Sequence, residues 1–377
     1  FSTFAINNLP ILKLPFTIKL AGWLLIAVLG TLILIYTKDF LLPIVIAALL
    51  ALLLYPVYKL LVKWKVPGVL SVIITMLLVL ILMVASVIFI SAELKSVLSD
   101  LNGVSAKMSE KLGRLQTYMA EHWQVEDATF TSWIANAKMK LMSYSGDLLS
   151  GTINTTTTIF STMVLIAVYV FCFLLYNRDF KDFAFALMET EKRNEATDII
   201  GDIQKLVQHY LLGMLTVIFI IGSLNTIGLL IVGVDHAVFF AFLAATLTII
   251  PYIGIFMGAS LPVLYTLITH DSVWPAVGVL AVFLVVQFME SNFITPKIVG
   301  KRVSINPFVA IVVLLIGGQI WGTAGMVLSI PLTAILKVLL DHRPHTKAFG
   351  YFLGSEFTDK KSNPMKIFGP RKTTLKK

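Results

Sequence analysis

Charge and cysteine are both scarce in this sequence. Asp, Glu, Lys and Arg make up only 14% of its 377 residues, whereas about 25% is typical of a soluble domain. Hydrophobic residues account for 57%. These proportions exclude a soluble globular protein, a disordered chain and a fibrous protein, and they predict a polytopic membrane protein. The single cysteine, Cys172, lies in an apolar run and has no second cysteine to pair with. We expect it to be a small buried hydrophobe.

Motifs of catalysis and metal binding are also missing. None of the six histidines belongs to an H-E-x-x-H pattern, and there is no G-x-S-x-G motif. The pair Gly300 and Lys301 lacks the upstream glycine of a phosphate-binding loop. His342 and His345 have no further ligands near them and are expected to face solvent. We therefore expect no enzyme, no metal ion and no cofactor. We assign the net charge of +9 to basic loops on the cytoplasmic side of a membrane rather than to a nucleic-acid partner.

Long apolar runs are what the sequence does have. A helix needs about 20 apolar residues to cross the hydrocarbon core. The runs that fit one span each are residues 20–36, 40–58, 69–91, 152–176, 210–232 and 272–289. Two more stretches, 237–269 and 303–340, are too long for one straight helix, because at about 1.5 Å per residue each would reach about 50 Å or more. The predicted fold class is an all-α polytopic membrane protein of about eight membrane segments, two of them broken or re-entrant helical hairpins.

Polar segments separate these runs. In residues 92–151, Leu and Met recur at three- and four-residue steps, which predicts an extracytoplasmic amphipathic helical segment. Residues 177–209 are interpreted as cytoplasmic amphipathic helices. The predicted organisation is 1–91 with three N-terminal membrane helices, 92–151 with the amphipathic segment, 152–176 with the fourth membrane helix, 177–209 with the cytoplasmic helices, 210–341 with a C-terminal transport core and 342–377 with a basic cytoplasmic tail.

The distribution of Lys and Arg predicts the orientation. With a cytoplasmic N-terminus, the basic loop after the second run and the basic C-terminal tail both fall inside. The segment 290–302 carries three cationic residues, whereas the competing loop at His270 and Asp271 carries none. If both long stretches double back as hairpins, 290–302 lies inside; if each crosses once, it lies outside. The positive-inside rule favours the hairpins, and both alternatives stay open at this level.

Both long stretches are interrupted near their middles by Gly and Pro. A pair of interrupted apolar segments is the best sequence pointer to a transporter's substrate site, because a break exposes carbonyl groups and helix ends. Each interruption also holds a G-x-x-x-G pattern that allows helices to approach closely; ordinary helix packing is the alternative explanation. The helix-break and motif residues are Pro251, Gly254, Gly258, Pro262, Pro296, Gly300, Lys301, Gly318, Gly322, Gly325 and Pro331.

Five polar residues complete the predicted substrate or coupling pathway: Glu290, Asn292, Gln287, Asn225 and Gln319. Glu290 is an acidic residue directly at the end of an otherwise apolar span, and an ionisable group at membrane depth indicates function. It would either titrate as a proton-coupling group or pair with a lysine in the segment that follows. A solvated or salt-bridged position at the interface is the alternative. Asn225 would hydrogen-bond across helices or contact the solute.

Four motifs resemble those of one transporter family. They are P-Y-I-G at 251–254 followed by Pro262, E-S-N-F-I-T-P-K-I-V-G-K at 290–301, G-G-Q-I-W-G-T-A-G-M-V-L-S-I-P-L at 317–332 followed by Lys337, and F-L-L-P at 40–43 followed by Pro56. On these residues the chain resembles the autoinducer-2 exporter family, also called PerM-like permeases. The resemblance covers about residues 20–341.

The resemblance implies a multi-pass transporter in the bacterial inner membrane, with about eight membrane segments and cytoplasmic termini. It also implies a homo-oligomer, for which a pentamer is one form. Family members include exporters of autoinducer-2 and sodium/proton antiporters, so the resemblance does not fix the solute. The leading hypothesis is a secondary transporter that exports a small polar solute, with autoinducer-2 as one candidate and a proton or sodium as the coupling ion. Sodium/proton antiport is the alternative within transport, and an oligomeric channel or a non-transporting membrane scaffold is the alternative from another class.

Overall fold

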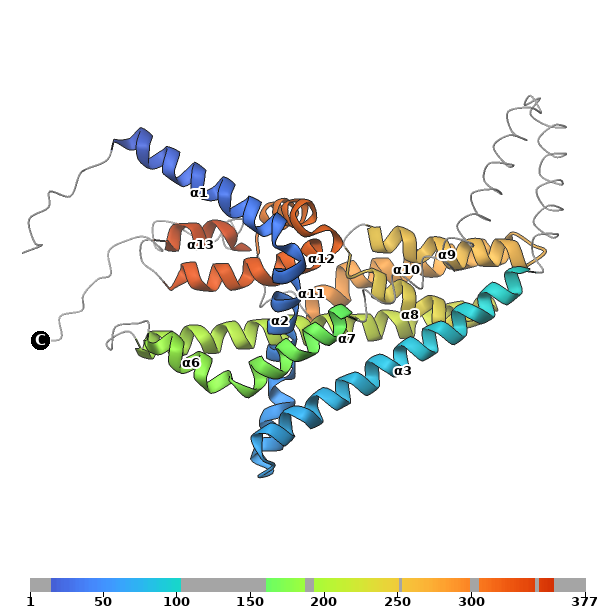
Figure 1. The fold of residues 1–377 in the computed structure, drawn as a ribbon. Coiled ribbons are helices and arrows are strands. Elements are labelled where there is room, and N and C mark those ends of the chain that lie inside the picture. Colours follow the sequence, from blue (N-terminus) through green and yellow to red (C-terminus); the bar gives the residue numbers. More distant parts are fainter. Residues whose placement is uncertain are drawn as a thin grey trace, which may run out of the picture.

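The computed structural model describes residues 15–102, 161–186, 193–250, 253–298, 305–342 and 346–355. In these ranges the chain is helical, apart from short connections and an isolated β-bridge between Ile305 and Gly354. The elements are α1 (Phe16–Tyr36), α2 (Lys38–Lys63), α3 (Gly68–Asn102), α6 (Asn177–Ala186), α7 (Arg193–Val232), α8 (Ala237–Leu247), α9 (Ile253–Thr269), α10 (Trp274–Met289), the π-helical turn η3 (Glu290–Ile294), α11 (Thr295–Ile298), α12 (Pro307–Asp341) and α13 (Lys347–Leu353) (Figure 1). A further helix at Ser161–Leu175 precedes α6.

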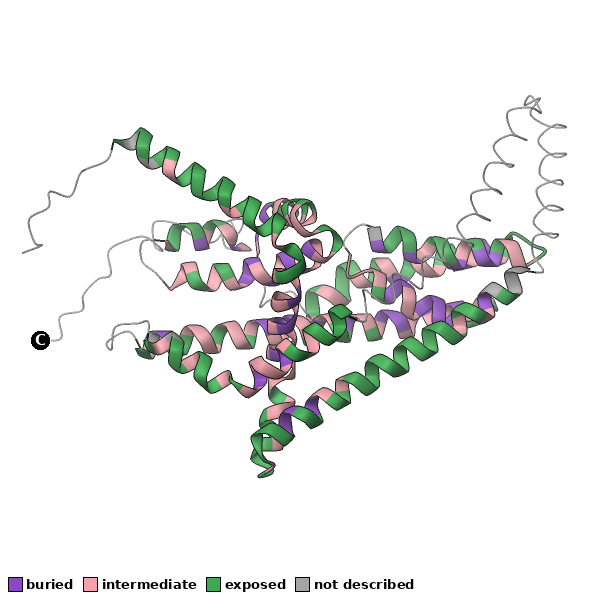
Figure 2. Cartoon of the chain, in the orientation of Figure 1, coloured by how far each residue is buried: buried purple, intermediate pink, exposed green. Residues whose placement is uncertain are grey.

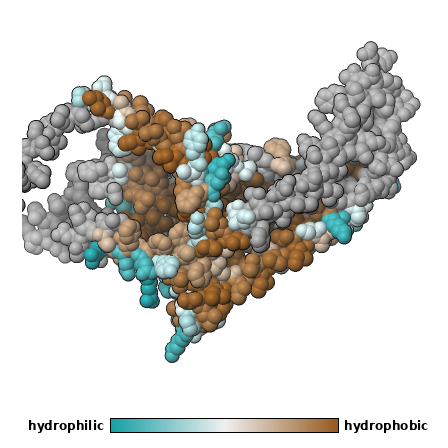
Figure 3. Space-filling view, viewed as in Figure 1, coloured by the Kyte–Doolittle hydropathy of each residue, from teal (hydrophilic) through white to brown (hydrophobic). Residues whose placement is uncertain are grey.

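The lengths and compositions of these helices confirm an all-α polytopic membrane protein. Within the described ranges, five helices are long and apolar enough to cross a membrane, or six if the bent pair Ser161–Leu175 and Asn177–Phe183 is one span. Large apolar side chains cover the surfaces of α1 and α3, whose residues are exposed along most of their length (Figures 2 and 3). Such surfaces are stable in hydrocarbon, where the backbone groups of a helix are satisfied internally.

At two predicted boundaries between an apolar and a polar segment, the helix continues without a break. The span predicted at 69–91 continues as α3 to Asn102, because residues 92–95 are good helix formers without Gly or Pro. The remainder of the predicted amphipathic segment, 103–151, lies outside the described residues. Likewise α7 joins part of the predicted cytoplasmic helices to the fifth span in one helix of 40 residues, which at 1.5 Å per residue is about 60 Å long. No proline interrupts residues 193–232.

The first long stretch, 237–269, doubles back. Its two helices, α8 and α9, are joined by a short connection that follows Leu247. A Cβ atom at Gly254 would overlap the carbonyl oxygen of Leu247, and one at Gly258 would lie 2.9 Å from the Cα atom of Ala244. These contacts pair residues on opposite sides of the break, so α8 and α9 form a hairpin held together by glycine.

The second long stretch also doubles back, within α12. Trp321 and Gly322 leave helical geometry, and Gly322 has a φ of 65°. Beyond this turn the second arm contacts the first, since Ser329 Oγ donates a hydrogen bond of 2.8 Å to the carbonyl oxygen of Val313. The structure thus has both broken stretches as helical hairpins, which was the alternative favoured by charge.

The prediction of a loop at 290–302 is wrong for its first nine residues, which are helical. Helix α10 continues through η3 and α11 to Ile298, so Glu290 lies inside a helix of 25 residues and not at its end. The N–H group of Thr295 bonds to the carbonyl oxygen of Glu290, which is the wider spacing of a π-helical turn. Pro296 follows this wider turn. Because proline has no backbone N–H group to donate, it would kink or break a regular α-helix at this point. Residues 299–304 lie outside the described residues.

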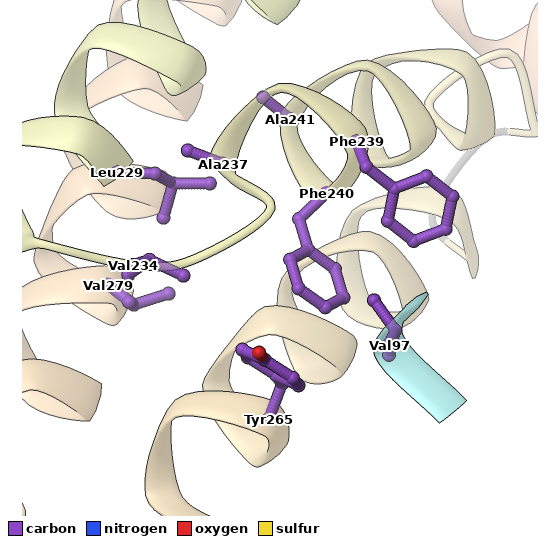
Figure 4. Packing of buried hydrophobic residues seen from close by; sticks show 9 residues of the cluster. All are labelled: Val97, Leu229, Val234, Ala237, Phe239, Phe240, Ala241, Tyr265 and Val279. Carbon is purple, nitrogen blue, oxygen red and sulfur yellow. The ribbon is translucent and has the colours of Figure 1, made fainter. Parts of the chain in front are cut away.

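Helix α7 is the central element of the packing, in contact with α2, α8, α10 and α12. Its glycines permit close approach: a Cβ atom at Gly222 would lie 2.9 Å from the ring of Phe242 on α8, and one at Gly228 would overlap Val282 on α10. A buried apolar cluster joins the end of α7 to α3, α8, α9 and α10. Figure 4 shows Phe240 of α8 beside Tyr265 of α9, with ring centroids 5.0 Å apart, and Val97 of α3 in the same cluster.

Candidate functional site

A cavity of about 300 Å³ lies among α7, α8, α9 and α10. It adjoins the break of the first hairpin, because Thr248 and Gly254, on the two sides of that break, both line it. The other walls come from Asn225 of α7 and Gln287 of α10. This volume is at the lower end of the range for small-molecule sites.

Asn225 is the buried polar residue of this cavity. Its side chain is 2% exposed, and its Oδ1 atom has no hydrogen-bond partner. The residue is placed there by α7, between Gly222 and Gly228, where the missing side chains bring α8 and α10 close. A buried acceptor without a partner costs about 1–3 kcal/mol, so packing alone does not explain why an asparagine occupies this position.

The turn of the first hairpin forms a second wall. Thr248 ends α8 and its Oγ1 atom donates 2.7 Å to the carbonyl oxygen of Ala245. Gly254 and Gly258 are buried, and both line the cavity where α9 begins. Because side chains at these positions would strike α8, glycine both closes the hairpin and leaves room beside it.

Helix α10 carries the third wall. Gln287 lines the cavity, and its Nε2 atom donates 3.1 Å to Ser291 Oγ. Glu290 lies three residues further along, outside the cavity lining. Its Oε2 atom is buried without a hydrogen-bond partner, as is Oγ1 of Thr295. Glu290 makes no ion pair with Lys297, which is exposed.

The structure brings together only some of the residues predicted for the pathway. Asn225, Gln287, Gly254 and Gly258 share the cavity. Asn292 is exposed and donates 2.9 Å to the carbonyl oxygen of Phe288. The other predicted residues in the described ranges do not line the cavity. They are Pro262, buried in α9; Pro296, exposed in α11; Gln319, exposed in α12; and Gly318, Gly322, Gly325 and Pro331 in the hairpin of α12. Pro251, Gly300 and Lys301 lie outside the described residues.

The second hairpin packs at a different place. The indole Nε1 of Trp321, at its turn, donates 3.0 Å to the carbonyl oxygen of Leu34 on α1. The same tryptophan packs with Leu49 of α2 and Val207 of α7. None of the cavity-lining residues, all within the described ranges, belongs to α12. The two breaks therefore do not meet at this cavity.

Sequence reasoning missed Thr248 and Ser260 as lining residues, and Thr266, whose buried Oγ1 atom has no partner. Their signal was weak, because a threonine or serine in an apolar helix ordinarily bonds to its own backbone. Only the position next to a helix break distinguishes Thr248.

Comparison with known proteins decides the family. The model of the AI-2E family transporter matches residues 24–344. The chain belongs to this family of transporters. The resemblance drawn from its motifs is confirmed, and so is the expectation of a multi-pass membrane protein of a bacterial transporter family.

Two relatives cover most of this AI-2E family chain. "Putative transport protein YueF" of Bacillus subtilis is 27% identical over 312 residues, which are 78% of this chain and 82% of the relative. "AI-2 transport protein TqsA" of Escherichia coli is 27% identical over 331 residues, which are 86% of this chain and 93% of the relative. Both names describe transport. In the described part of this transporter, no group of three or more His, Cys, Asp and Glu residues is arranged to hold a metal ion.

Proposed function

We propose that this AI-2E family transporter is a secondary transporter that binds a small solute in the cavity among α7, α8, α9 and α10 and exports it. The observation that carries this proposal is a cavity beside a helix break that is lined by the buried polar residue Asn225. Broken apolar helices with polar groups at the break are the usual construction of transporter sites. The α8–α9 hairpin is the element that would move to expose the cavity to each side in turn.

The finer identity of the solute is also a proposal. A small polar solute is the leading class, and autoinducer-2 is one candidate because TqsA is named as an AI-2 transport protein. A proton or a sodium ion would supply the coupling. Glu290 is the proposed coupling group, since its Oε2 atom is buried without a partner inside a π-helical turn. Turns of this kind are frequent at functional sites.

We place the protein in the bacterial inner membrane with both termini in the cytoplasm. Support comes from the basic residues at Lys59, Lys63 and Lys65 and in the C-terminal tail. In this orientation the α8–α9 hairpin enters from outside and the α12 hairpin from inside. The lipid bilayer covers the exposed apolar faces of α1 and α3. A homo-oligomer, with a pentamer as one form, would cover part of them.

The test is efflux from vesicles containing the full chain and loaded with autoinducer-2. We expect Asn225→Leu to lower the initial rate at least tenfold, because the substitution replaces the polar amide on the cavity wall with a larger apolar side chain. The matched control is Thr216→Val on the same helix: Thr216 is exposed and bonds only to its own backbone, at Leu212, so its rate should be unchanged. Equal rates for Asn225→Leu and the native chain would remove the proposed site.

Sodium/proton antiport is the second candidate, favoured by Glu290. Vesicles with a sodium gradient and an internal pH dye, but no organic solute, distinguish it. A proton flux that follows sodium and is lost in Glu290→Gln supports antiport. A solute-dependent flux without sodium dependence supports the export proposal. Non-saturating flux would indicate a channel, and no flux of either kind would indicate a scaffold.

A further inference from the structure

The C-terminal end of α3 is tied to the first hairpin by a polar pair. Oε2 of Glu93 on α3 lies 2.7 Å from Nδ1 of His236, the residue immediately before α8. The two residues are 143 positions apart in the sequence, and their side chains are 30% and 16% exposed. With a proton on Nδ1 the ring donates to the carboxylate, and a positive charge on the ring strengthens the bond. This pair therefore connects two separate parts of the fold.

His236 also contacts the other arm of the hairpin. Its ring meets the ring of Tyr265 on α9 edge-on, with centroids 5.9 Å apart. Tyr265 packs in turn against Phe240 of α8, with centroids 5.0 Å apart. Because α8 begins directly after His236 and Tyr265 lies near the end of α9, these rings are at the base of the hairpin, away from its break. Glu93 is therefore linked through one imidazole to both arms of the hairpin.

An apolar contact reinforces this pair. Val97 follows Glu93 by four residues, so both side chains lie on the same face of α3. Val97 is buried and belongs with Phe240 to the cluster shown in Figure 4. Residues 76–92 of α3 include no buried side chain, and the next buried one is Thr75, near the other end of the helix. In its described part, α3 is thus an arm that is buried only near its two ends.

The backbone at His236 has an uncommon conformation. Its φ of 57° and ψ of 28° lie in the left-handed region. Residues other than glycine seldom adopt this conformation, and they keep it where the surrounding contacts hold them in place. The contacts with Glu93 and Tyr265 are among those that hold His236 here. Release of the ring would let the connection between α7 and α8 return to a more common conformation.

We propose that Glu93 and His236 form a releasable latch. Closed, as in the structure, it holds the base of the α8–α9 hairpin against α3; it opens each time the hairpin moves to carry a solute across. The inference rests on the proposed function, since it concerns the motion of the hairpin that lines the cavity. In the proposed orientation the latch lies on the extracytoplasmic side.

Reversible cross-linking tests whether the latch must open. Cys172 is the one cysteine of the chain, so Cys172→Ala with Glu93→Cys and His236→Cys leaves two thiols across the pair. A disulfide needs Cβ atoms about 3.5–4.5 Å apart. Because these two side chains meet tip to tip, a bis-methanethiosulfonate reagent with a four-carbon spacer is used instead. The initial efflux of autoinducer-2 from vesicles containing the full chain is measured before bridging, after bridging and after reduction. Glu93→Cys with Ser96→Cys is the matched control, because that bridge stays within α3.

We expect the bridge between positions 93 and 236 to lower the efflux rate at least tenfold, and reduction to restore it. The bridge within α3 should leave the rate unchanged. Undiminished efflux with the bridge between positions 93 and 236 in place would overturn the proposal, because the base of the hairpin would then have no need to leave α3.

A distance measurement tests the latch without transport. Nitroxide labels at Leu94→Cys on α3 and Leu264→Cys on α9, both exposed positions, in the Cys172→Ala background report by electron paramagnetic resonance how α3 lies against the hairpin. Glu93→Leu should add a population at longer distance. Lys95→Leu is the matched control, because it removes an exposed charge from the same helix, and it should add none. An unchanged distance distribution in Glu93→Leu would overturn the latch.

The latch and the transport proposal fail separately. No efflux from the native chain, with a label distance that responds to Glu93→Leu, would remove the transport proposal and leave the latch between α3 and the hairpin. Efflux that depends on Asn225 and persists with the bridge in place would remove the latch and leave the transport proposal.

Discussion

The two helical hairpins of this transporter have similar breaks and different surroundings. At the α8–α9 break, the nearby acceptor of Asn225 is buried and unpartnered, and a cavity opens beside it. At the α12 break, polar side chains find partners: Trp321 bonds to Leu34, and Ser329 bonds across the arms to Val313. The first hairpin thus has the properties of a binding element, and the second those of a packed structural element.

The ends of the second hairpin are also fixed. The N–H group of Asn306, which caps the first arm, donates 2.8 Å to the carbonyl oxygen of Leu353 in α13. At the end of the second arm, Lys337 Nζ donates 2.6 Å to Asp341, and the two residues pack against Gly354 and Gly350. Helix α13 therefore contacts both ends of the hairpin. A Gly/Pro break in the sequence does not by itself show whether a hairpin binds a solute, because that depends on what packs against the break.

The largest expected effect is on closure of the first hairpin. The Cβ atom of Gly254→Ala would overlap the carbonyl oxygen of Leu247. A backbone atom can move less than a side-chain atom to relieve such an overlap. We expect a loss of about 3 kcal/mol in the free energy of unfolding, at the upper end for overpacking, seen as a lower melting temperature. Gly201→Ala in α7 is the control, because no atom lies within 4 Å of its Cβ position. Equal melting temperatures for the two variants would contradict the hairpin contact.

The next effect differs in sign between Ser329, inside the second hairpin, and Asn225 of α7, beside the first hairpin. Ser329→Ala removes the bond between the arms of α12 and should lower the free energy of unfolding by about 1–2 kcal/mol. Asn225→Leu removes an unpaired buried acceptor and should leave this free energy unchanged or raise it by about 1 kcal/mol. Thermal unfolding of both variants without solute measures this. A destabilised Asn225→Leu would show that the amide has a structural partner and would weaken the contrast.

The smallest effect concerns the turn of α12. Gly322 has a φ of 65° and a ψ of −146°, a conformation that residues with a side chain rarely adopt. No atom lies within 4 Å of its Cβ position, so only backbone strain opposes Gly322→Ala. We expect a loss of about 1 kcal/mol, at the low end of the cost of such strain, with solute flux per folded molecule unchanged. A large loss of flux at normal stability would mean that the second hairpin also takes part in transport.

Much of the fold could be predicted from the sequence, because membrane spans depend on local composition. The apolar runs, their interruption by Gly and Pro, and the charge of segment 290–302 were enough to favour two hairpins. The continuation of α10 through Glu290 was not predicted, because polar residues and Pro296 resemble the end of a helix. It required the wider turn at 290–294, which has no clear sequence signature.

The site was predictable in part. Asn225, Gln287, Gly254 and Gly258 were selected for being polar or glycine in apolar helices, and they do share a cavity. Gln319 was selected by the same rule and lies exposed in α12. Which of these residues meet depends on tertiary packing along α7, where Gly222 and Gly228 draw in α8 and α10. No rule of spacing along one helix contains that information.

The most direct test of the central claim is an experimental structure of the full chain in lipid with autoinducer-2 at saturating concentration. Our account predicts density for the solute in the cavity among α7, α8, α9 and α10, beside Asn225. Solute density at the turn of α12, with none in this cavity, would contradict it.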